Sequence, residues 1–540
     1  MQTSSPDADC LIIGAGVAGA LLACGLARKG LRVTMLEAGP HIDRANAVRQ
    51  YQHAFPKVPE CAYPLSSFTP HPVTHRIEDF YVQKGPDLFR STYLKQVGGT
   101  TWHWLGTAVR FVPDDFVLRS KFGLAVDWPF GYQTLEPWYA AAERELGVSG
   151  NDADDLGSPR SGPYPLPPVP QSYLDLQWDA SLRTSTLKVS ATPQARLSRA
   201  QENRPACCGS ASCIPVCPVQ AKYDATVHTA RAVKLGVHIR ANTVATFIES
   251  QANGRITGVR WRRPDGSSGR ITARTVIVAA NAMETPRLLL ASASPHVPAG
   301  LANRSDQVGR NLMDHPIQLS WALTDKPVWP YRGPGSTSGI ETLRTGSWRS
   351  THSALRLEIG NDGWSWPTGA PDDTARRLVL AGLRGTELDR ALRAETSRHV
   401  RLAALTEQLP SAENRVTLDP VLRDGSGLAR PVIHYRIDDY TRAGFEQARR
   451  QHEVLFRHLG TTGVQHSDQA QGAGHILGTA RMGAEATTSV VNAELRAHDH
   501  ANLYLVGGAT FPTSATANPT LTIAALALRA VDVIAGNAGG

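Results

Sequence analysis

A cluster of cysteines is the part of the sequence with the most specific chemistry. Four of the seven cysteines lie within eleven residues, in the segment Cys207-Cys208-Gly-Ser-Ala-Ser-Cys213-Ile-Pro-Val-Cys217-Pro218. The C-x3-C-P spacing at its end is half of an iron–sulfur signature, and it favours an iron–sulfur cluster. Zinc is one alternative, although zinc takes four ligands and a second cysteine pair is missing. A disulfide is the other: adjacent cysteines could form one only with strain, but any two of the others could pair.

A histidine and an asparagine near the C-terminus are the next candidates. His475 lies in a stretch of small residues at 474–483, and Asn518 lies in the segment 510–522, which opens a helix. An imidazole has an intrinsic pKa suited to accepting a hydroxyl proton near neutrality, and an amide can hold the same oxygen by a hydrogen bond. One histidine among eighteen is more often structural, so spacing alone does not assign this role.

A glycine-rich turn near the N-terminus predicts a dinucleotide site. An apolar run at 11–13 predicts a buried parallel strand, and glycines at i, i+2 and i+5 lead from it into a helix: Gly14, Gly16 and Gly19. Gly14 permits the tight turn, and Gly16 permits the close approach of a pyrophosphate. Gly19 lets the helix pack on the strand. A second strand at 31–36 ends at Glu37, where a ribose-binding carboxylate is expected. This acid argues against NADP but does not separate FAD from NAD.

Two other segments predict backbone close to a bound group. Gly98 and Gly99 precede Thr101 in a loop at 96–111, although a plain glycine-punctuated loop is an alternative. A buried strand at 274–280 runs into a turn at Asn281 and a helix through residue 290. A strand, a small-residue turn and a helix suit a ligand at the carboxyl end of a parallel sheet.

The remaining chain predicts an α/β protein with two domains. A helix is expected at 135–146, another at 225–235, and strands at 237–240 and 256–262, whereas 39–84 reads as connecting segments. Alternating strand patterns and a charged helix near 378–400 predict a largely antiparallel substrate domain at 317–467. A strand at 502–506 and a helix at 521–534 have the same pattern as the N-terminal nucleotide-binding part. The nucleotide-binding domain is therefore discontinuous, at 1–316 (with the cysteine loop at 205–220) and 468–540, and its last part carries the catalytic residues.

Composition excludes some classes of function. The 540 residues are 41% hydrophobic and 19% charged, and the net charge of +8 is spread along the chain. No dense basic run with interleaved aromatic residues is present, so nucleic-acid binding is not expected. No apolar run reaches the length of a membrane-spanning helix, and residues 1–8 lack the features of a signal peptide. Taken alone, this predicts the cytoplasm, unless a partner carries the chain across a membrane.

Several motifs together resemble the glucose–methanol–choline (GMC) family of flavin oxidoreductases. They are the N-terminal glycines with residues 36–39, the Gly98-Gly99 loop, Glu284-Thr-Pro-Arg-Leu-Leu, residues 309–316 and Asn518-Pro519-Thr520-Leu521-Thr522. The resemblance implies FAD in the two-ended domain and a catalytic pair at His475 and Asn518. The expected cofactor contacts are Gly14, Gly16, Gly19, Glu37, Gly98, Gly99, Thr101, His103, Val244, Asn281 and Thr520.

Within the family, the loop at 101–104 and the cysteine segment are most similar to the catalytic subunits of bacterial FAD-dependent glucose dehydrogenases and their sorbitol, fructose and gluconate relatives. That similarity implies a [3Fe–4S] cluster on Cys207, Cys213 and Cys217, with Cys208 free to form a disulfide with a partner. It also implies a small partner subunit with an export signal and a multihaem cytochrome c as electron acceptor. The chain would then be exported as a passenger and be periplasmic, attached to a membrane only through its partners.

The expected reaction is oxidation of a sugar or polyol hydroxyl by hydride transfer to flavin N5, with glucose or another aldose as the best single substrate. Gly474 stands where the glucose enzymes are expected to have asparagine, and Gly507-Gly508 stands where many members carry an acid. His103 is a candidate for covalent flavin attachment, as in some pyranose oxidases. Two alternatives are an oxygen-using sugar or alcohol oxidase with structural cysteines, and a non-catalytic FAD-binding electron-transfer subunit.

Overall fold

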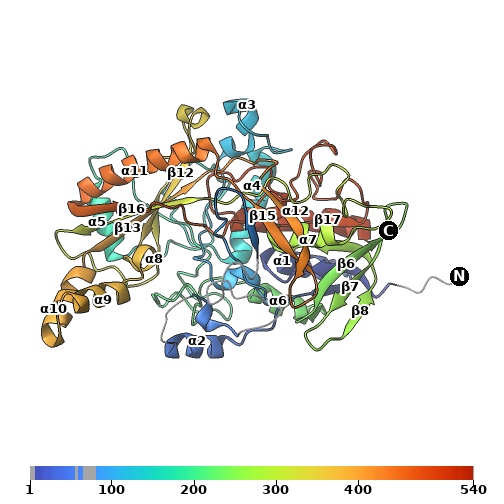
Figure 1. Cartoon of the computed structure of the whole chain (residues 1–540), viewed down its shortest axis with the longest axis horizontal. Helices are drawn as coiled ribbons and strands as arrows, with labels where there is room; N and C mark the ends of the chain where they lie inside the picture. The colour runs from blue at the N-terminus through green and yellow to red at the C-terminus, as the bar shows by residue number, and fades with distance from the viewer. Residues whose placement is uncertain (1–5, 55–58, 65–80, 539–540) are drawn as a thin grey trace.

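A parallel sheet and an antiparallel sheet lie side by side and organise the molecule (Figure 1). The computed structural model describes residues 6–54, 59–64 and 81–538. The first sheet has the strand order β17-β9-β1-β2-β5, and the second has the order β16-β10-β13-β12-β11-β4. The predicted α/β class, with a Rossmann-like sheet beside an antiparallel one, is confirmed.

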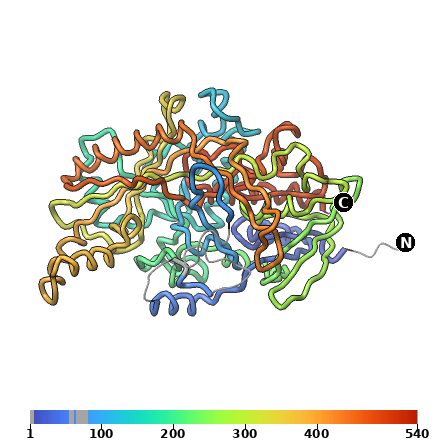
Figure 2. Tube along the Cα trace, viewed as in Figure 1, coloured from blue at the N-terminus to red at the C-terminus, as the bar shows by residue number. Residues whose placement is uncertain are grey.

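The parallel sheet joins the two ends of the chain. Its strands are β1 (Ala8–Ile13), β2 (Val33–Leu36), β5 (His238–Arg240), β9 (Ala273–Val278) and β17 (Leu503–Leu505). β9 pairs with β1 on one side and with the C-terminal β17 on the other. Their apolar residues are buried because helices cover the sheet. Figure 2 shows both termini at the same end of the molecule.

The helices α1 (Val17–Arg28), α4 (Tyr132–Leu146), α6 (Thr226–Lys234) and α12 (Thr520–Ala538) pack around this sheet, and α7 (Asn281–Ala291) follows β9. α1 and α12 approach closely at Gly25, where a Cβ atom would lie 2.5 Å from a methyl group of Val531. By length and composition, α12 is long and apolar enough to cross a membrane, so the expectation that no apolar run reaches this length is wrong. Its most apolar stretch is 56% buried, because it packs against α1 and α4.

One face of the antiparallel sheet packs into an apolar core, and the other face carries both charged and apolar residues. Its strands are β4 (Ser190–Ala191), β10 (Ile317–Thr324), β11 (Ser338–Ile340), β12 (Leu355–Gly360), β13 (His399–Thr406) and β16 (Thr461–His466). Residues of α5 (Tyr173–Ser181) and α11 (Asp439–Leu459) share a core with alternate residues of β12 and β13. The intervening residues face the other way, as the two-residue period of a strand requires.

Two three-stranded sheets complete the fold. β6 (Val244–Ser250), β7 (Ile256–Arg262) and β8 (Ser268–Ile271) are antiparallel, and a turn at 264–266 joins β7 to β8. β14 (Arg415–Arg423) and β15 (Ala429–His434) form a hairpin to which β3 (Val82–Lys84) adds in parallel. The short helices α3 (Leu118–Phe122) and α8 (Ser365–Thr368) lie in loops.

Two expectations about local structure are wrong. The single charged helix near 378–400 is two helices, α9 (Asp372–Leu380) and α10 (Gly385–Thr396), because Gly382 takes a left-handed φ of 95° between them. The connecting stretch at 39–84 contains α2 (Arg44–His53), whose first turn is capped by the Asp43 carboxylate. The rest of that stretch is described only in part, and of the N-terminal residues 1–8 the first five lie outside the described residues.

Candidate active site

One cavity of about 1140 Å³ brings together most of the predicted site residues. The parallel-sheet layer and the antiparallel sheet both contribute to its wall. The predicted residues on this wall are Gly14, Gly16, Glu37, Gly99, Thr101, His103, Cys213, Val244, Asn281, His475, Asn518 and Thr520. Gly19, Gly98, Cys207 and Cys217 are not among the residues that line it.

The turn after β1 forms an open cradle in this cavity. A Cβ atom on Gly16 would meet nothing within 4 Å, so the position opens to the cavity. Gly14 has a φ of 106°, and a Cβ there would lie 2.5 Å from the carbonyl oxygen of Ala279. A Cβ on Gly19 would lie 2.0 Å from the Gly14 oxygen, so this glycine lets α1 pack against the turn. The geometry fits a pyrophosphate at the N-terminus of α1.

The second glycine loop touches the first. The Gly98 N–H donates to the carbonyl oxygen of Ala15 at 3.0 Å, and Gly98 itself takes a φ of 97°. A Cβ on Gly99 would lie 3.2 Å from the Gly16 Cα atom. Two glycine backbones therefore approach each other at the cavity wall, where side chains would occupy the ligand space.

Glu37 ends β2 as a buried carboxylate. Its oxygens accept the N–H groups of Ala15 at 2.8 Å and Gly39 at 2.9 Å. Burial raises the pKa of Glu37 to about 7, while these N–H groups oppose the rise. A carboxylate fixed in this way on the cavity wall suits hydroxyl donors, as a ribose provides. The cradle and this acid together fit the dinucleotide FAD.

His475 and Asn518 come together although they are far apart in the sequence. The Asn518 Nδ2 atom lies 3.3 Å from His475 Nε2, and His475 Nδ1 lies 3.1 Å from His315 Nδ1. His315 Nε2 faces the carbonyl oxygen of Ala515 at 3.1 Å, so this nitrogen must carry a proton. In the neutral ring, His315 Nδ1 then accepts from His475 Nδ1–H. His475 Nε2 is left as a lone-pair acceptor beside Asn518.

Burial keeps both histidines neutral. It lowers the pKa of His315 to about 4. It also lowers the pKa of His475 well below its ordinary value, since the neighbouring His315 and the charge of Arg356 further disfavour a proton there. The buried Asp314 carboxylate accepts the backbone N–H groups of His315 at 2.7 Å and His475 at 3.0 Å, so it holds both backbones in place. Asn518 Oδ1 is buried and has no hydrogen-bond partner within the described chain, which leaves an acceptor for a ligand donor.

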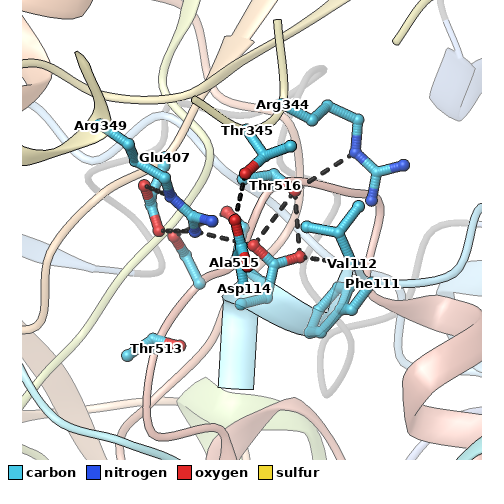
Figure 3. Close-up of polar contacts among 12 residues, drawn as sticks. Phe111, Val112, Asp114, Arg344, Thr345, Arg349, Glu407, Thr513, Ala515 and Thr516 are labelled. Carbon is cyan, nitrogen blue, oxygen red and sulfur yellow. Dashed lines mark hydrogen bonds and ion pairs between the residues drawn. The ribbon is translucent and has the colours of Figure 1, made fainter. Parts of the chain in front are cut away.

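A buried ion cluster holds the loop that precedes Asn518 (Figure 3). Arg349 pairs with Asp115 at 2.7 Å and donates from Nε to Glu407 at 3.0 Å, and all three side chains have 0% exposure. The Thr516 hydroxyl donates to Asp115 at 3.0 Å and accepts from Arg344 Nε at 3.2 Å. Segments far apart in the sequence therefore converge beneath this loop.

The segment 101–104 forms another part of the wall. Burial, followed by the charge of Lys222, lowers the pKa of His103 to about 3, so its ring is neutral. The buried Lys222 ammonium donates to the carbonyl oxygens of Trp102 at 2.8 Å and Trp104 at 2.7 Å. The Thr101 hydroxyl donates to the carbonyl oxygen of Gly98 and accepts from Ala225 N–H at 2.9 Å.

The cysteine segment borders the same cavity at Cys213. Cys213 and Cys217 are buried, Cys208 is exposed, and all four thiols of the segment are unpaired. The sulfur of Cys217 accepts the Lys222 N–H at 3.5 Å, and that of Cys207 accepts the Gly209 N–H at 3.4 Å. Burial raises the pKa of the Cys207 thiol. A negative charge on Cys213 or Cys217 would raise it further.

Within the described ranges, no three His, Cys, Asp or Glu side chains converge on a position for a single metal ion. An iron–sulfur cluster places each thiolate on a different iron atom, so it does not need such convergence. Unpaired thiols and N–H donors to sulfur are the groups that such a cluster uses. The donor chemistry of Cys207, Cys213 and Cys217 therefore fits a cluster.

Sequence reasoning missed the residues that the antiparallel sheet contributes. Glu358 on β12 and Arg401 on β13 reach the cavity wall, together with Asn361 and Asp362, which follow β12. A signal was available, because charged residues alternate with apolar ones at 355–359. These residues lie far in the sequence from the nucleotide motifs, so the pattern did not indicate that they belong to the same site. The role of His315 was likewise missed, although it lies inside the motif at 309–316.

A nucleotide cradle that shares one cavity with a neutral histidine and an asparagine defines a dinucleotide-dependent oxidoreductase. Models described as GMC oxidoreductase match residues 183–317 and 410–527, and a Rossmann-like NAD(P)-binding model matches residues 12–90. The chain belongs to the GMC oxidoreductase family.

Similar proteins support this assignment over nearly the full length. The chain is 36% identical to the fructose dehydrogenase large subunit of Gluconobacter japonicus, over 99% of each chain. It is 29% identical to 2-methyl-1,2-propanediol dehydrogenase of Mycolicibacterium austroafricanum, over 99% of this chain and 96% of the relative. It is 23% identical to the gluconate 2-dehydrogenase flavoprotein of Pantoea cypripedii, over 96% and 92%.

Solved structures agree on the fold. Pyridoxine 4-oxidase from Mesorbium loti matches with a TM-score of 0.67 at 18% identity, covering 98% of this chain and 99% of that one. An Aspergillus oryzae formate oxidase variant matches with a TM-score of 0.64 at 14% identity, covering 98% and 99%. At these identities the likeness concerns the fold alone.

Proposed function

We propose that this protein is an FAD-dependent dehydrogenase that oxidises a hydroxyl group of a sugar or polyol. The observation that carries this proposal is the lone pair on His475 Nε2, held beside Asn518 in the cavity that also contains the nucleotide cradle. FAD, when bound, would accept the hydride that leaves the carbon bearing the hydroxyl group.

His475 acts as the general base in this proposal. Its Nε2 atom takes the hydroxyl proton, while its Nδ1–H stays bonded to His315. The Asn518 amide holds the substrate oxygen and orients it toward the base. Because burial keeps the imidazole neutral, the base is ready at neutral pH without first losing a proton.

The substrate class rests on the relatives and on the cavity. The relatives named above act, by their names, on a sugar, a diol and a sugar acid, all of which carry more than one oxygen function. Glucose or another aldose is the first substrate to test, with fructose as the matched competitor. Gly474 lacks a side chain that could contact the sugar, so ketoses and polyols are tested alongside it.

The cysteine segment supports an electron exit. A [3Fe–4S] cluster held by Cys207, Cys213 and Cys217 would supply one-electron chemistry next to the cavity, which favours a dehydrogenase over an oxygen-using oxidase. The "large subunit" name of one relative supports partner subunits. We propose a small subunit with an export signal, joined through the exposed Cys208, and a multihaem cytochrome c acceptor in the periplasm.

Anaerobic reduction of the bound flavin by a panel of sugars tests the function. D-Glucose, D-fructose, D-sorbitol and D-gluconate are mixed with the oxidised holoenzyme, and the flavin absorbance is followed. Bleaching by at least one of them is expected. Its absence with all four would favour a non-catalytic FAD-binding subunit. Rapid reoxidation by oxygen alone would favour an oxidase.

A further inference from the structure

A buried carboxylate on the cavity wall has no role in the chemistry above. Glu358 on β12 is 4% exposed and lines the cavity. Among the described residues no hydrogen bond reaches its carboxylate, and its ion pair with Arg356 Nη1 is long, at 3.7 Å. A buried carboxylate without hydrogen bonds is costly, unless a ligand provides the donors.

The pattern of strand β12 explains why this side chain faces the cavity. Leu355, Leu357 and Ile359 pack into the core beneath α11, so the alternating Glu358 must face the opposite side. The residues paired with Glu358 on the two neighbouring strands are Gly339 and Ala403. On the Ala403 side only a methyl group stands beside the carboxylate. On the Gly339 side the Arg356–Glu341 pair lies where a side chain would be, each residue with an atom 3.1 Å from the Cβ position of Gly339.

The neighbouring cations bond mainly to other groups. Arg356 Nε lies 3.0 Å from a Glu341 oxygen and its Nη2 donates to Thr192 at 3.1 Å, while its Nη1 has no hydrogen-bond partner among the described residues. Arg401 donates from Nε and Nη2 to one oxygen of Asp362 at 2.9 and 2.6 Å. Burial raises the pKa of Glu358, and the charges of Arg356 and Arg401 oppose the rise. Asp362, on the same wall, is occupied by its bonds to Arg401. The oxygens of Glu358 stay available.

We propose that Glu358 binds hydroxyl groups of the substrate beside the reacting carbon and thereby selects polyhydroxylated substrates. A carboxylate only accepts hydrogen bonds, and its two oxygens match neighbouring hydroxyl donors of a sugar or diol. Glu358 lines the same cavity as His475 and Asn518, so one bound substrate can reach all three. This inference rests on the proposed function and names the group that recognises its substrate class.

Calorimetry on the reduced holoenzyme tests this binding without turnover. The flavin is first reduced with dithionite, and D-glucose, D-fructose and D-sorbitol are then titrated. Glu358→Gln keeps the shape of the side chain but removes its charge, and we expect the dissociation constant of the best ligand to rise about 10- to 100-fold. Glu453→Gln, an exposed substitution on α11 away from the cavity, is the matched control and should leave it unchanged.

Flavin reduction separates binding from chemistry. In the oxidised Glu358→Gln enzyme, the limiting rate of reduction should stay within about threefold of the parent while the sugar concentration for half-maximal rate rises. Equal dissociation constants in parent and variant, or no sugar binding by the parent, would overturn the inference. Weaker binding by the variant without flavin reduction in the parent would support Glu358 and reject the proposed function. Should the glutamine variant lose its flavin, Glu358→Asp, which keeps the charge but shortens the reach, should show the same loss of affinity.

Discussion

His315 and His475 meet through their Nδ1 atoms at 3.1 Å, and the carbonyl oxygen of Ala515 decides which of the two donates. His315 is thus a positioning residue for the base: it fixes the tautomer in which His475 Nε2 carries the lone pair. An asparagine at 315 can keep an acceptor toward His475, whereas a leucine cannot. The two substitutions therefore separate tautomer control from simple packing.

We expect His315→Leu to lower the rate of flavin reduction by about 10²- to 10⁴-fold, the scale seen when a catalytic histidine loses its orienting partner. His315→Asn should restore a large part of that rate. Stopped-flow reduction by the best sugar, with flavin content as the check on folding, measures both. Equal rates in the two variants would reject tautomer control.

Replacement of the base itself should have a larger and simpler effect. His475→Ala removes the Nε2 acceptor, so the rate of flavin reduction should fall by about 10²-fold or more. FAD should stay bound, because the nucleotide cradle lies on other elements. Near-normal reduction by this variant would make His475 a structural residue.

Gly16→Val should abolish FAD binding. The Cβ position opens to the cavity with no protein atom within 4 Å, so the fold tolerates the side chain while the pyrophosphate does not. Flavin per protein measures the loss. Gly131→Val is the matched control, because Gly131 also precedes a helix with an extended backbone and has no atom within 4 Å of its Cβ position. Full FAD content in the Gly16 variant would contradict the cradle.

The cysteine segment is tested by four serine variants. Cys207→Ser, Cys213→Ser and Cys217→Ser should each lower iron per protein, whereas the exposed Cys208→Ser should leave it unchanged. Flavin reduction by sugar should survive loss of the iron, and reduction of a cytochrome c should fail. Iron missing from the anaerobically purified parent, or lost equally in all four, would refute these ligands.

The ion cluster of Figure 3 should contribute strongly to stability. Arg349→Met leaves Asp115 and Glu407 buried without their common cation, which should lower the free energy of unfolding by about 3–5 kcal/mol. Urea unfolding of the holoenzyme measures the change. Arg393→Met breaks the exposed pair with Asp389 and should cost less than about 1 kcal/mol. Similar losses in the two variants would contradict a special role for the buried cluster.

Much of the nucleotide site could be predicted from the sequence, because its information is local. A strand, three glycines, a helix and an acid occur in order, and backbone φ, helix polarity and strand direction then bring Gly16 and Glu37 to one cavity. The cysteine segment is equally local. The antiparallel domain was also predictable, since two-residue alternation marks its strands. The break between α9 and α10 was missed, because Gly382 lies inside a pattern that otherwise favours a helix.

Only the tertiary structure decided which side chains complete the site. The cavity-facing side of the antiparallel sheet, the pairing of His315 with His475, and the cluster around Arg349 join segments separated by 58 to 401 residues. Such contacts depend on strand register and on how the two layers pack, and no local spacing encodes them. Glu358 shows this most clearly, since it faces the cavity because its neighbours Leu357 and Ile359 pack into the core under α11. The motifs specify the cofactor site, and the packing of the two sheets determines what lies opposite it.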